Sequence, residues 1–272
     1  MNEPTMRETR LFVDAHVHFY DCFDPSTFFS SAYANLSSPT EAAIDNEASV
    51  KVLLLTETPR ENGFLRLLDA SENIVQPICT GGESWYSHTT GEVDSVSLKT
   101  HSGKVLYVIA GRQIVSHEGL EVHALATDAF FDEDRPLLEL IEAINRSGGV
   151  AAVPWGTGKW LGRRGKVLTS MSPRFVQAGV LLSDSGIRPW AWPRSGLFNS
   201  GPRVIAGTDP LPISTEAYRT GSFGFSTVAP WDPERPTHSM RAILRNQLLE
   251  MTRFGRPQGV WQFLSRQLAI RT

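Results

Sequence analysis

Cysteine is scarce in this sequence, which has only Cys22 and Cys79 among its 272 residues. Two cysteines are too few for a disulfide scaffold or for a cysteine-rich zinc module. No apolar run approaches the roughly 18 residues of a membrane-spanning helix, and the polar N-terminal segment MNEPTMRETR lacks the apolar core of a signal peptide. The formal net charge of -3 argues against a protein that binds nucleic acid mainly through its charge. These absences predict a cytoplasmic protein without membrane or nucleic-acid partners.

Two common catalytic signatures are also missing, namely a Gly-x-Ser-x-Gly nucleophile elbow and a dinucleotide-binding glycine fingerprint. What the chain does have is 41% hydrophobic and 20% charged residues, which is enough apolar material for a sizeable core. Its length suits one α/β barrel, a fold of about 250 residues. We therefore expect a single domain over residues 1–272.

Short apolar runs bounded by turn residues recur along the chain and predict β-strands. Several runs are continuous rather than alternating, as in VKVLLLT at 50–56, and such strands are typically buried on both faces of a parallel sheet. The runs are Leu11–His18, Val50–Thr56, Lys104–Ile109, Leu120–Ala126, Gly149–Pro154, Gly179–Leu182 and Arg203–Gly207.

Apolar residues at helical spacing predict a helix over Arg135–Ser147, which Gly148 and Gly149 then end. Two more helices, over about 240–251 and 260–268, are expected in a C-terminal helical extension that covers 235–272.

Turn residues divide the remaining segments. Residues 83–127 carry glycines between extended stretches, which predicts an antiparallel β insertion. Residues 155–178 and 188–202 are rich in Gly, Trp, Arg and Pro, and we expect them to be long loops at the active-site face. The whole pattern predicts an α/β fold, a distorted (β/α)7-8 TIM-like barrel with this insertion and the C-terminal helices.

The segment VDAHVH at 13–18 is the pattern most typical of a metal site. Residues two apart on a strand point the same way, so Asp14, His16 and His18 are expected on one face. Two neighbouring imidazoles at a strand end are a ready pair of metal ligands, and Asp14 could accept a proton from one of their ring nitrogens. The alternative is a pair of polar-face histidines that bind no metal. The place of the motif on the first apolar strand favours the metal site.

The segment RVIAGTDP at 203–210 runs from a buried strand into a glycine and then presents Asp209. In an α/β barrel, the carboxyl ends of the strands hold the active site. Asp209 is therefore a candidate to ligate a metal or to take a proton from a water that the metal activates. Initiation of a turn ahead of Pro210 is the alternative role.

Taken together, VDAHVHF and AGTDP resemble the metal-dependent hydrolases built on α/β barrels, and two branches of that group match. Residues 111–125, GRQIVSHEGLEVHAL, and 138–155, LELIEAINRSGGVAAVPW, resemble strands and a helix of the PHP family, named for polymerase and histidinol phosphatase domains. GTDP is equally typical of the amidohydrolase superfamily. The resemblance covers roughly residues 11–212 and implies a divalent metal cofactor such as Zn, Mn or Fe.

The chain departs from the PHP pattern at three positions. Gln113 stands where the family has a metal-bridging glutamate, Trp155 where it has a histidine, and Leu211 where a histidine follows the aspartate. Glutamine is a poor ligand and tryptophan is none. The resemblance therefore implies one ion at most, with His16, His18 and Asp209 as its core ligands.

Four further residues could complete such a site, and each has an alternative role. His123, on the apolar strand EVHAL, is the metal-ligand candidate among them, and a hydrogen-bonded core histidine is the other possibility. Asp184 ends a buried strand and could instead initiate a turn. The four residues are Asp24, Glu121, His123 and Asp184.

The segment at 156–166 contains four cations, Lys159, Arg163, Arg164 and Lys166, and follows a predicted strand end. Because arginine and lysine bind phosphate and carboxylate groups, we expect Lys159 or Arg163 to neutralise an anionic small-molecule substrate. The alternative is a solvated helix face.

Three functions remain open from the sequence. The first is metal-dependent hydrolysis of a small phosphate ester through a metal-activated water, with Asp209, Lys159 and Arg163 as catalytic residues. The second is an amidohydrolase-type attack on a C–N or lactone bond. The third is a barrel without catalysis that serves as a binding or scaffold subunit.

Overall fold

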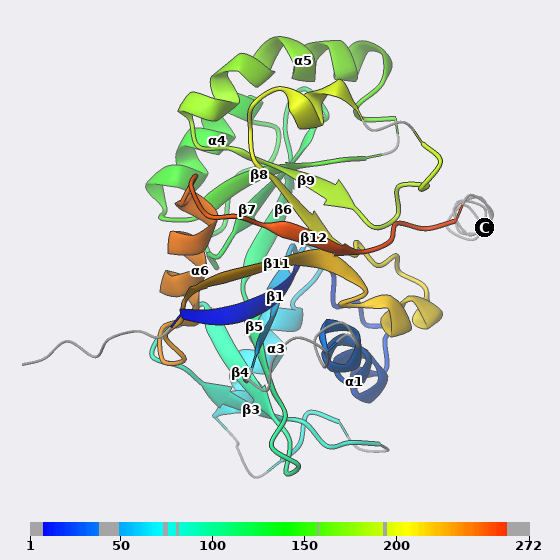
Figure 1. The fold of residues 1–272 in the computed structure, drawn as a ribbon, viewed down its shortest axis with the longest axis vertical. Helices are drawn as coiled ribbons and strands as arrows, with labels where there is room; N and C mark the ends of the chain where they lie inside the picture. The colour runs from blue at the N-terminus through cyan, green and yellow to red at the C-terminus, as the bar shows by residue number, and fades with distance from the viewer. Residues whose placement is uncertain are drawn as a thin grey trace, which may run out of the picture.

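The computed structural model describes residues 8–37, 49–72, 76–79, 82–156, 158–192 and 195–259. Within these ranges, the strands form two mixed sheets, one of seven strands and one of five (Figure 1).

The larger sheet consists of β1 (Glu8–Val17), β2 (Val50–Leu55), β3 (Tyr86–Thr89), β4 (Ser95–Lys99), β5 (Val105–Ile109), β11 (Phe223–Pro230) and β12 (Thr252–Gly255). Its strand order is β12-β11-β1-β2-β5-β4-β3. β1, β2 and β5 pair in parallel, and the outer strands on both sides pair antiparallel. The carboxyl ends of β1 and β2 therefore lie at the same edge.

The smaller sheet consists of β6 (Gly111–Val115), β7 (Glu121–Leu125), β8 (Val150–Pro154), β9 (Leu181–Ser185) and β10 (Val204–Gly207), in the order β10-β9-β8-β7-β6. β8, β9 and β10 run parallel, and β7 runs antiparallel to both of its neighbours.

The described helices are α1 (Pro25–Leu36), α3 (Gly63–Ser71), α4 (Leu137–Arg146), α5 (Gly162–Gln177) and α6 (Pro236–Arg245), with short 3-10 turns η1 (Gly196–Asn199) and η2 (Ser214–Arg219). In Figure 1, α4 and α5 lie at the top beside the smaller sheet, and α1 lies in the lower half beside the larger one. None of the helices in the described ranges is long and apolar enough to cross a lipid bilayer.

β1 is buried from Leu11 to Val17 because it lies between two apolar clusters. Leu11, Val13 and Ala15 pack in one cluster, whereas Phe12 and Val17 pack in the other. The burial of both faces explains the continuous apolar run. The same burial holds β1 in place, and His16 and His18 lie at and just beyond its carboxyl end.

All seven predicted strands are confirmed to within three residues at their ends, and the helix predicted at 135–147 is confirmed as α4. The first predicted C-terminal helix, at about 240–251, is confirmed only in part, because α6 begins earlier and ends at Arg245. The strand β12 then follows in a segment where no strand was predicted. The second predicted helix, at 260–268, lies outside the described residues.

The prediction of a closed (β/α) barrel is wrong. In the described residues, the strands form two sheets with separate strand orders. One isolated β-bridge, between Glu57 and Arg112, joins them. A (β/α) barrel needs parallel strands that alternate regularly with helices, whereas β3 to β7 follow one another without a helix between them. The predicted antiparallel insertion at 83–127 is correspondingly split, because β3, β4 and β5 join one sheet while β6 and β7 join the other.

The prediction of a loop throughout residues 155–178 is also wrong, because α5 occupies most of that segment. Glycine, arginine and Pro173 obscure its helical pattern, yet Leu168 and Phe175 are fully buried on one side. Pro173 has no N–H to offer the carbonyl of Thr169. The hydroxyl of Ser172 donates to that carbonyl instead, at 2.9 Å.

Asp14 joins three strands at the centre of the fold. Its Oδ1 accepts the backbone N–H of Thr208 after β10 at 2.8 Å, and its Oδ2 accepts that of Gly221 before β11 at 2.8 Å. The side chain is fully buried, and this burial raises the pKa of Asp14 to about 6 against the opposing effect of those hydrogen bonds. Asp14 therefore braces the backbone and does not accept a proton from a histidine ring.

Replacement of Asp14 by alanine is expected to lower the free energy of unfolding by about 2–5 kcal/mol, because two buried N–H donors lose their acceptor. Urea unfolding at pH 7.5 measures the change. Asp24→Ala is the matched control, because Asp24 is an exposed helix cap that accepts from the N–H of Thr27, and loss of such a cap costs about 1 kcal/mol. Equal losses in the two variants would contradict the bracing role.

Candidate metal centre

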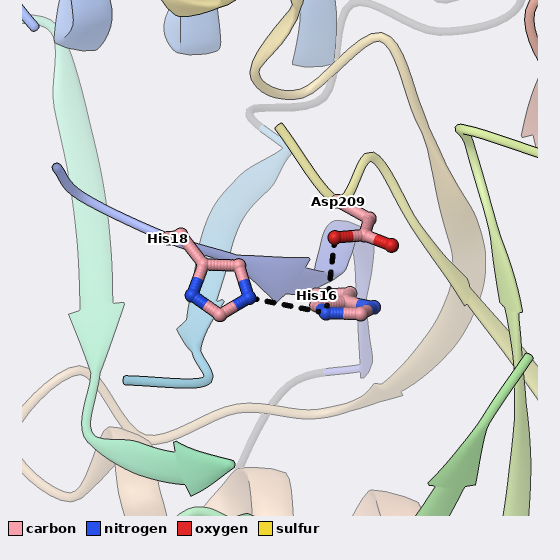
Figure 2. A group of neighbouring side chains, drawn as sticks. All are labelled: His16, His18 and Asp209. Atoms are coloured by element: carbon pink, nitrogen blue, oxygen red, sulfur yellow. Dashed lines mark hydrogen bonds and ion pairs between the residues drawn. The ribbon is translucent and has the colours of Figure 1, made fainter. Parts of the chain in front are cut away.

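Three side chains with metal-ligand atoms meet where β1 and β10 end, as Figure 2 shows. His16 lies in β1, His18 directly follows it, and Asp209 lies two residues beyond β10. The N–H of Asp209 donates to the carbonyl of His16 at 2.8 Å, which ties the two strand ends together. Asp209 has a φ of 53°, and this left-handed backbone conformation turns the chain sharply after β10.

The ligand atoms of this group lie within 4.8 Å of one another. His16 Nε2 is 3.3 Å from His18 Nε2 and 3.4 Å from Asp209 Oδ1 (Figure 2). Both histidines are only 2% exposed, and the other oxygen of Asp209 accepts from Ser185 Oγ at 2.7 Å. The three side chains are therefore held in place and converge on one point.

His18 is oriented by residues that follow β2. Its Nδ1 lies 2.9 Å from Glu61 Oε2, and Glu61 Oε1 accepts from the hydroxyl of Thr58 at 2.6 Å. The ring of Tyr20 stacks on the imidazole, with centroids 5.2 Å apart. Burial alone would lower the pKa of His18, but the hydrogen bond and charge of Glu61, with Asp209 and Glu57, outweigh it and raise the pKa. Because Glu61 occupies Nδ1, the other ring nitrogen of His18, Nε2, points toward His16.

His16 and His123 are both buried imidazoles. Burial, with the neighbouring histidines, holds the pKa of each well below its usual range. Their rings meet edge to face at 4.2 Å, and His123 Nε2 lies 3.1 Å from Gln113 Oε1. His123 lies against His16 but outside the group of converging ligand atoms. The structure thus places this predicted ligand beside the centre, with a glutamine as its hydrogen-bond partner.

The two cations chosen from the sequence lie in different places. Lys159 forms an ion pair with Glu121, and its charge acts on both His16 and Asp209. Burial lowers the pKa of Lys159 to about 8. Arg163 is exposed on α5 and lines a cleft with His117 and Gly119. Lys159 is therefore near the centre, whereas Arg163 lines a different surface.

The remaining candidate carboxylates are occupied. Asp24 caps α1, and Glu121 accepts from both Lys159 and Gln113. Asp184 is fully buried and binds the guanidinium groups of Arg188 and Arg253. None of these three carboxylates is free to approach His16 and His18.

The departures from the PHP pattern fall on two kinds of position. Gln113 lies next to the centre, since it hydrogen-bonds His123 and its amide acts on His16. Trp155 is 4% exposed and packs in an apolar cluster, with its ring 6.4 Å from that of Trp192. Gln113 is therefore a polar neighbour of the site, and Trp155 is a core residue.

Sequence reasoning missed Glu61 and Tyr20, the two side chains that hold His18. It also missed Glu57, a 1% exposed carboxylate that accepts from the N–H of Phe64 and pairs with Arg112. Burial raises the pKa of Glu57. The pattern VLLLTETPRE could have revealed Glu57 and Glu61, because carboxylates directly after a buried parallel strand lie at the functional edge.

No protein-family model matches the sequence, and no curated protein matches it in sequence. The fold resembles the crystal structure of PsfC from Pseudomonas syringae PB-5123, with a TM-score of 0.55 and 12% identity over 96% of this chain and 99% of that chain. A two-domain protein from Bacteroides vulgatus ATCC 8482, which contains a predicted PHP-like metal-dependent phosphoesterase, matches with a TM-score of 0.46 and 12% identity. That match covers 92% of this chain and 65% of that one. At such identities, the similarity to PsfC shows a shared fold alone, and the second match is too distant to support an argument.

Replacement of Glu61 by glutamine is expected to weaken zinc binding about 10- to 100-fold at pH 8, because a carboxylate partner makes an imidazole ligand more basic. The loss should shrink as the pH falls, because the native His18, with its raised pKa, keeps a competing proton to higher pH. Competition titration with a chromophoric chelator at pH 6 and 8 measures both effects. Glu142→Gln on the exposed face of α4 is the control, and equal affinity in all three proteins would contradict the role of Glu61.

Proposed function

We propose that this protein is a metal-dependent hydrolase that cleaves phosphate esters of small molecules. One divalent ion would be held by His16, His18 and Asp209. The observation that carries the proposal is the convergence of two imidazole nitrogens and one carboxylate oxygen within 4.8 Å at the ends of β1 and β10.

The chemistry of these donors suits a divalent ion. Two histidines and one carboxylate are a typical catalytic zinc set, which leaves a further position open. With its Nδ1 hydrogen-bonded to Glu61, His18 turns its Nε2 toward His16 Nε2, 3.3 Å away, so that both ring nitrogens face the same point. His16 Nδ1 is also buried without a hydrogen-bond partner in the described part of the chain.

A bound divalent ion acts as a Lewis acid and lowers the pKa of a bound water toward about 7. The residues of this chain contribute orientation and charge. Ser185 holds one oxygen of Asp209, so the other stays turned toward His16. Lys159 adds a positive charge close to Asp209, and cations at that place stabilise the negative charge of a phosphoryl group during transfer. Hydrolysis breaks the ester bond with water and releases an alcohol and inorganic phosphate.

The test combines metal content with activity. The purified chain is loaded with excess Zn²⁺ or Mn²⁺ and desalted, and its metal is measured by mass spectrometry alongside phosphate release from a panel of small phosphomonoesters. We expect about one ion per chain and phosphate release that stops when a chelator removes the ion. Two or more bound ions would overturn the single-ion site. Firm binding of one ion without release from any ester would overturn the hydrolase and favour a binding subunit.

A further inference from the structure

A cleft of about 720 Å³ lies beside the metal centre. Its lining includes Tyr20 and Glu61, the two side chains that contact the ring of His18. Pro212, three residues beyond Asp209, lines it as well. This volume is in the usual range for small-molecule sites. The cleft therefore begins one side chain away from His18, although none of the three candidate ligands lines it.

The cleft contains two charged side chains that no described residue pairs with. Asp21 pairs with Arg66, and Glu61 is occupied by His18 and Thr58. Arg60 and Glu133 also line the cleft, and neither has an ion pair or side-chain hydrogen bond with any described residue. A ligand in the cleft thus meets one free cation and one free anion.

Arg60 projects from a turn that is tied to the metal centre. The backbone N–H of Glu61 donates to the carbonyl of Thr58 at 3.0 Å, and the hydroxyl of Thr58 donates a hydrogen bond to the Glu61 carboxylate. Pro59 restricts the backbone between them, and Glu61 is bonded to His18. A preorganised backbone lowers the entropy lost when a ligand binds, and this turn holds the backbone of the exposed Arg60 in place relative to His18.

The cations chosen from the sequence are not placed to bind a ligand in this cleft. Lys159 is engaged by Glu121, and Arg163 and Arg164 line a separate cleft with residues 117–119. Among the described residues that line the cleft beside His18, Arg60 is the one cation.

We propose that this cleft binds a zwitterionic group of the substrate, with a carboxylate on Arg60 and an ammonium group on Glu133. The inference rests on the proposed function and gives its substrate class, the phosphate esters of hydroxy amino acids. Arginine binds carboxylates through paired hydrogen bonds, and a free carboxylate opposite it selects a ligand that carries both charges over one that carries the carboxylate alone.

The experiment measures binding with phosphonates, which cannot be hydrolysed, so that affinity is separated from activity. Four matched probes are titrated calorimetrically into the full zinc-loaded chain. They are 2-amino-4-phosphonobutanoate with both groups, 4-phosphonobutanoate with the carboxylate only, 3-aminopropylphosphonate with the ammonium only, and propylphosphonate with neither. We expect the probe with both groups to bind about tenfold more tightly than either single-group probe and about a hundredfold more tightly than propylphosphonate.

Two substitutions assign the contacts. Arg60→Gln should remove the advantage of the carboxylate and leave that of the ammonium, and Glu133→Gln should do the reverse. Arg174→Gln, at an exposed position of α5, is the control and should change neither. Arg163→Gln tests the cation chosen from the sequence, and a carboxylate advantage lost there but kept in Arg60→Gln would overturn the assignment.

The outcome is independent of the hydrolase proposal. Equal affinity for the four phosphonates would overturn the inference even if the protein released phosphate from every ester offered. Conversely, the expected order of affinities without phosphate release from any ester, O-phosphoserine included, would support the cleft and overturn the hydrolase.

Discussion

Replacement of His16 by alanine should abolish metal binding and reduce phosphate-ester hydrolysis by about three orders of magnitude or more, because the metal contributes several kcal/mol of charge stabilisation in the transition state. His16 has the largest expected effect of the three ligands. Its Nε2 lies 3.3 Å from His18 and 3.4 Å from Asp209, so it is the atom that connects the other two. Metal content and kcat/KM for the best phosphomonoester measure the two losses.

A matched control separates this loss from damage to the fold. His238 is exposed on α6, and His238→Ala should keep native metal content and activity. His16→Gln retains a polar side chain of similar volume in the buried position and should also lose the metal, while circular dichroism shows a native fold. Full metal content in both His16 variants would show that the ion binds elsewhere, and the proposed centre would then be wrong.

The convergence of His16, His18 and Asp209 could be anticipated because each lies at or just beyond the end of a strand that is recognisable from its apolar run. A strand with apolar residues on both faces is typically buried inside a parallel sheet. The end of its apolar run therefore marks where a functional side chain can lie. Lys159 could be placed near the centre by the same argument, since it follows the end of β8 closely. That argument gives no information on its partner Glu121, which comes from an antiparallel neighbour of β8.

Side chains on turns could not be placed in this way. Glu61 contacts His18 because the turn after β2 bends back toward it. Arg163 does not reach the metal centre because it lies on the exposed side of α5. Sequence periodicity reports burial along one element and contains no information on the relative direction of two elements. The barrel prediction failed for a related reason. The turn residues of 83–127 predicted antiparallel strands, but they contain no information on which sheet each strand joins, and β3 to β5 lie in one sheet while β6 and β7 lie in the other.

Gly207 is the position where the metal centre depends most on backbone geometry. A Cβ at this residue would lie 2.2 Å from the backbone nitrogen of His16 and 2.4 Å from its Cβ. Neither atom belongs to a flexible side-chain end, so β10 could not approach β1 this closely with any other residue at the position. The same approach allows the N–H of Asp209 to bond the carbonyl of His16.

Gly207→Ala is therefore expected to lower the free energy of unfolding by about 3 kcal/mol or more, as overpacking in a rigid core does, and to weaken zinc binding at least tenfold in the protein that still folds. The reason is that moving β10 away from β1 carries Asp209 away from His16. Urea unfolding and chelator competition measure the two effects. Gly196→Ala is the matched control, because no atom lies within 4 Å of its Cβ position, and its stability and zinc affinity should be native. A Gly207→Ala protein with native stability and native zinc affinity would show that the contact between the two strands does not position Asp209.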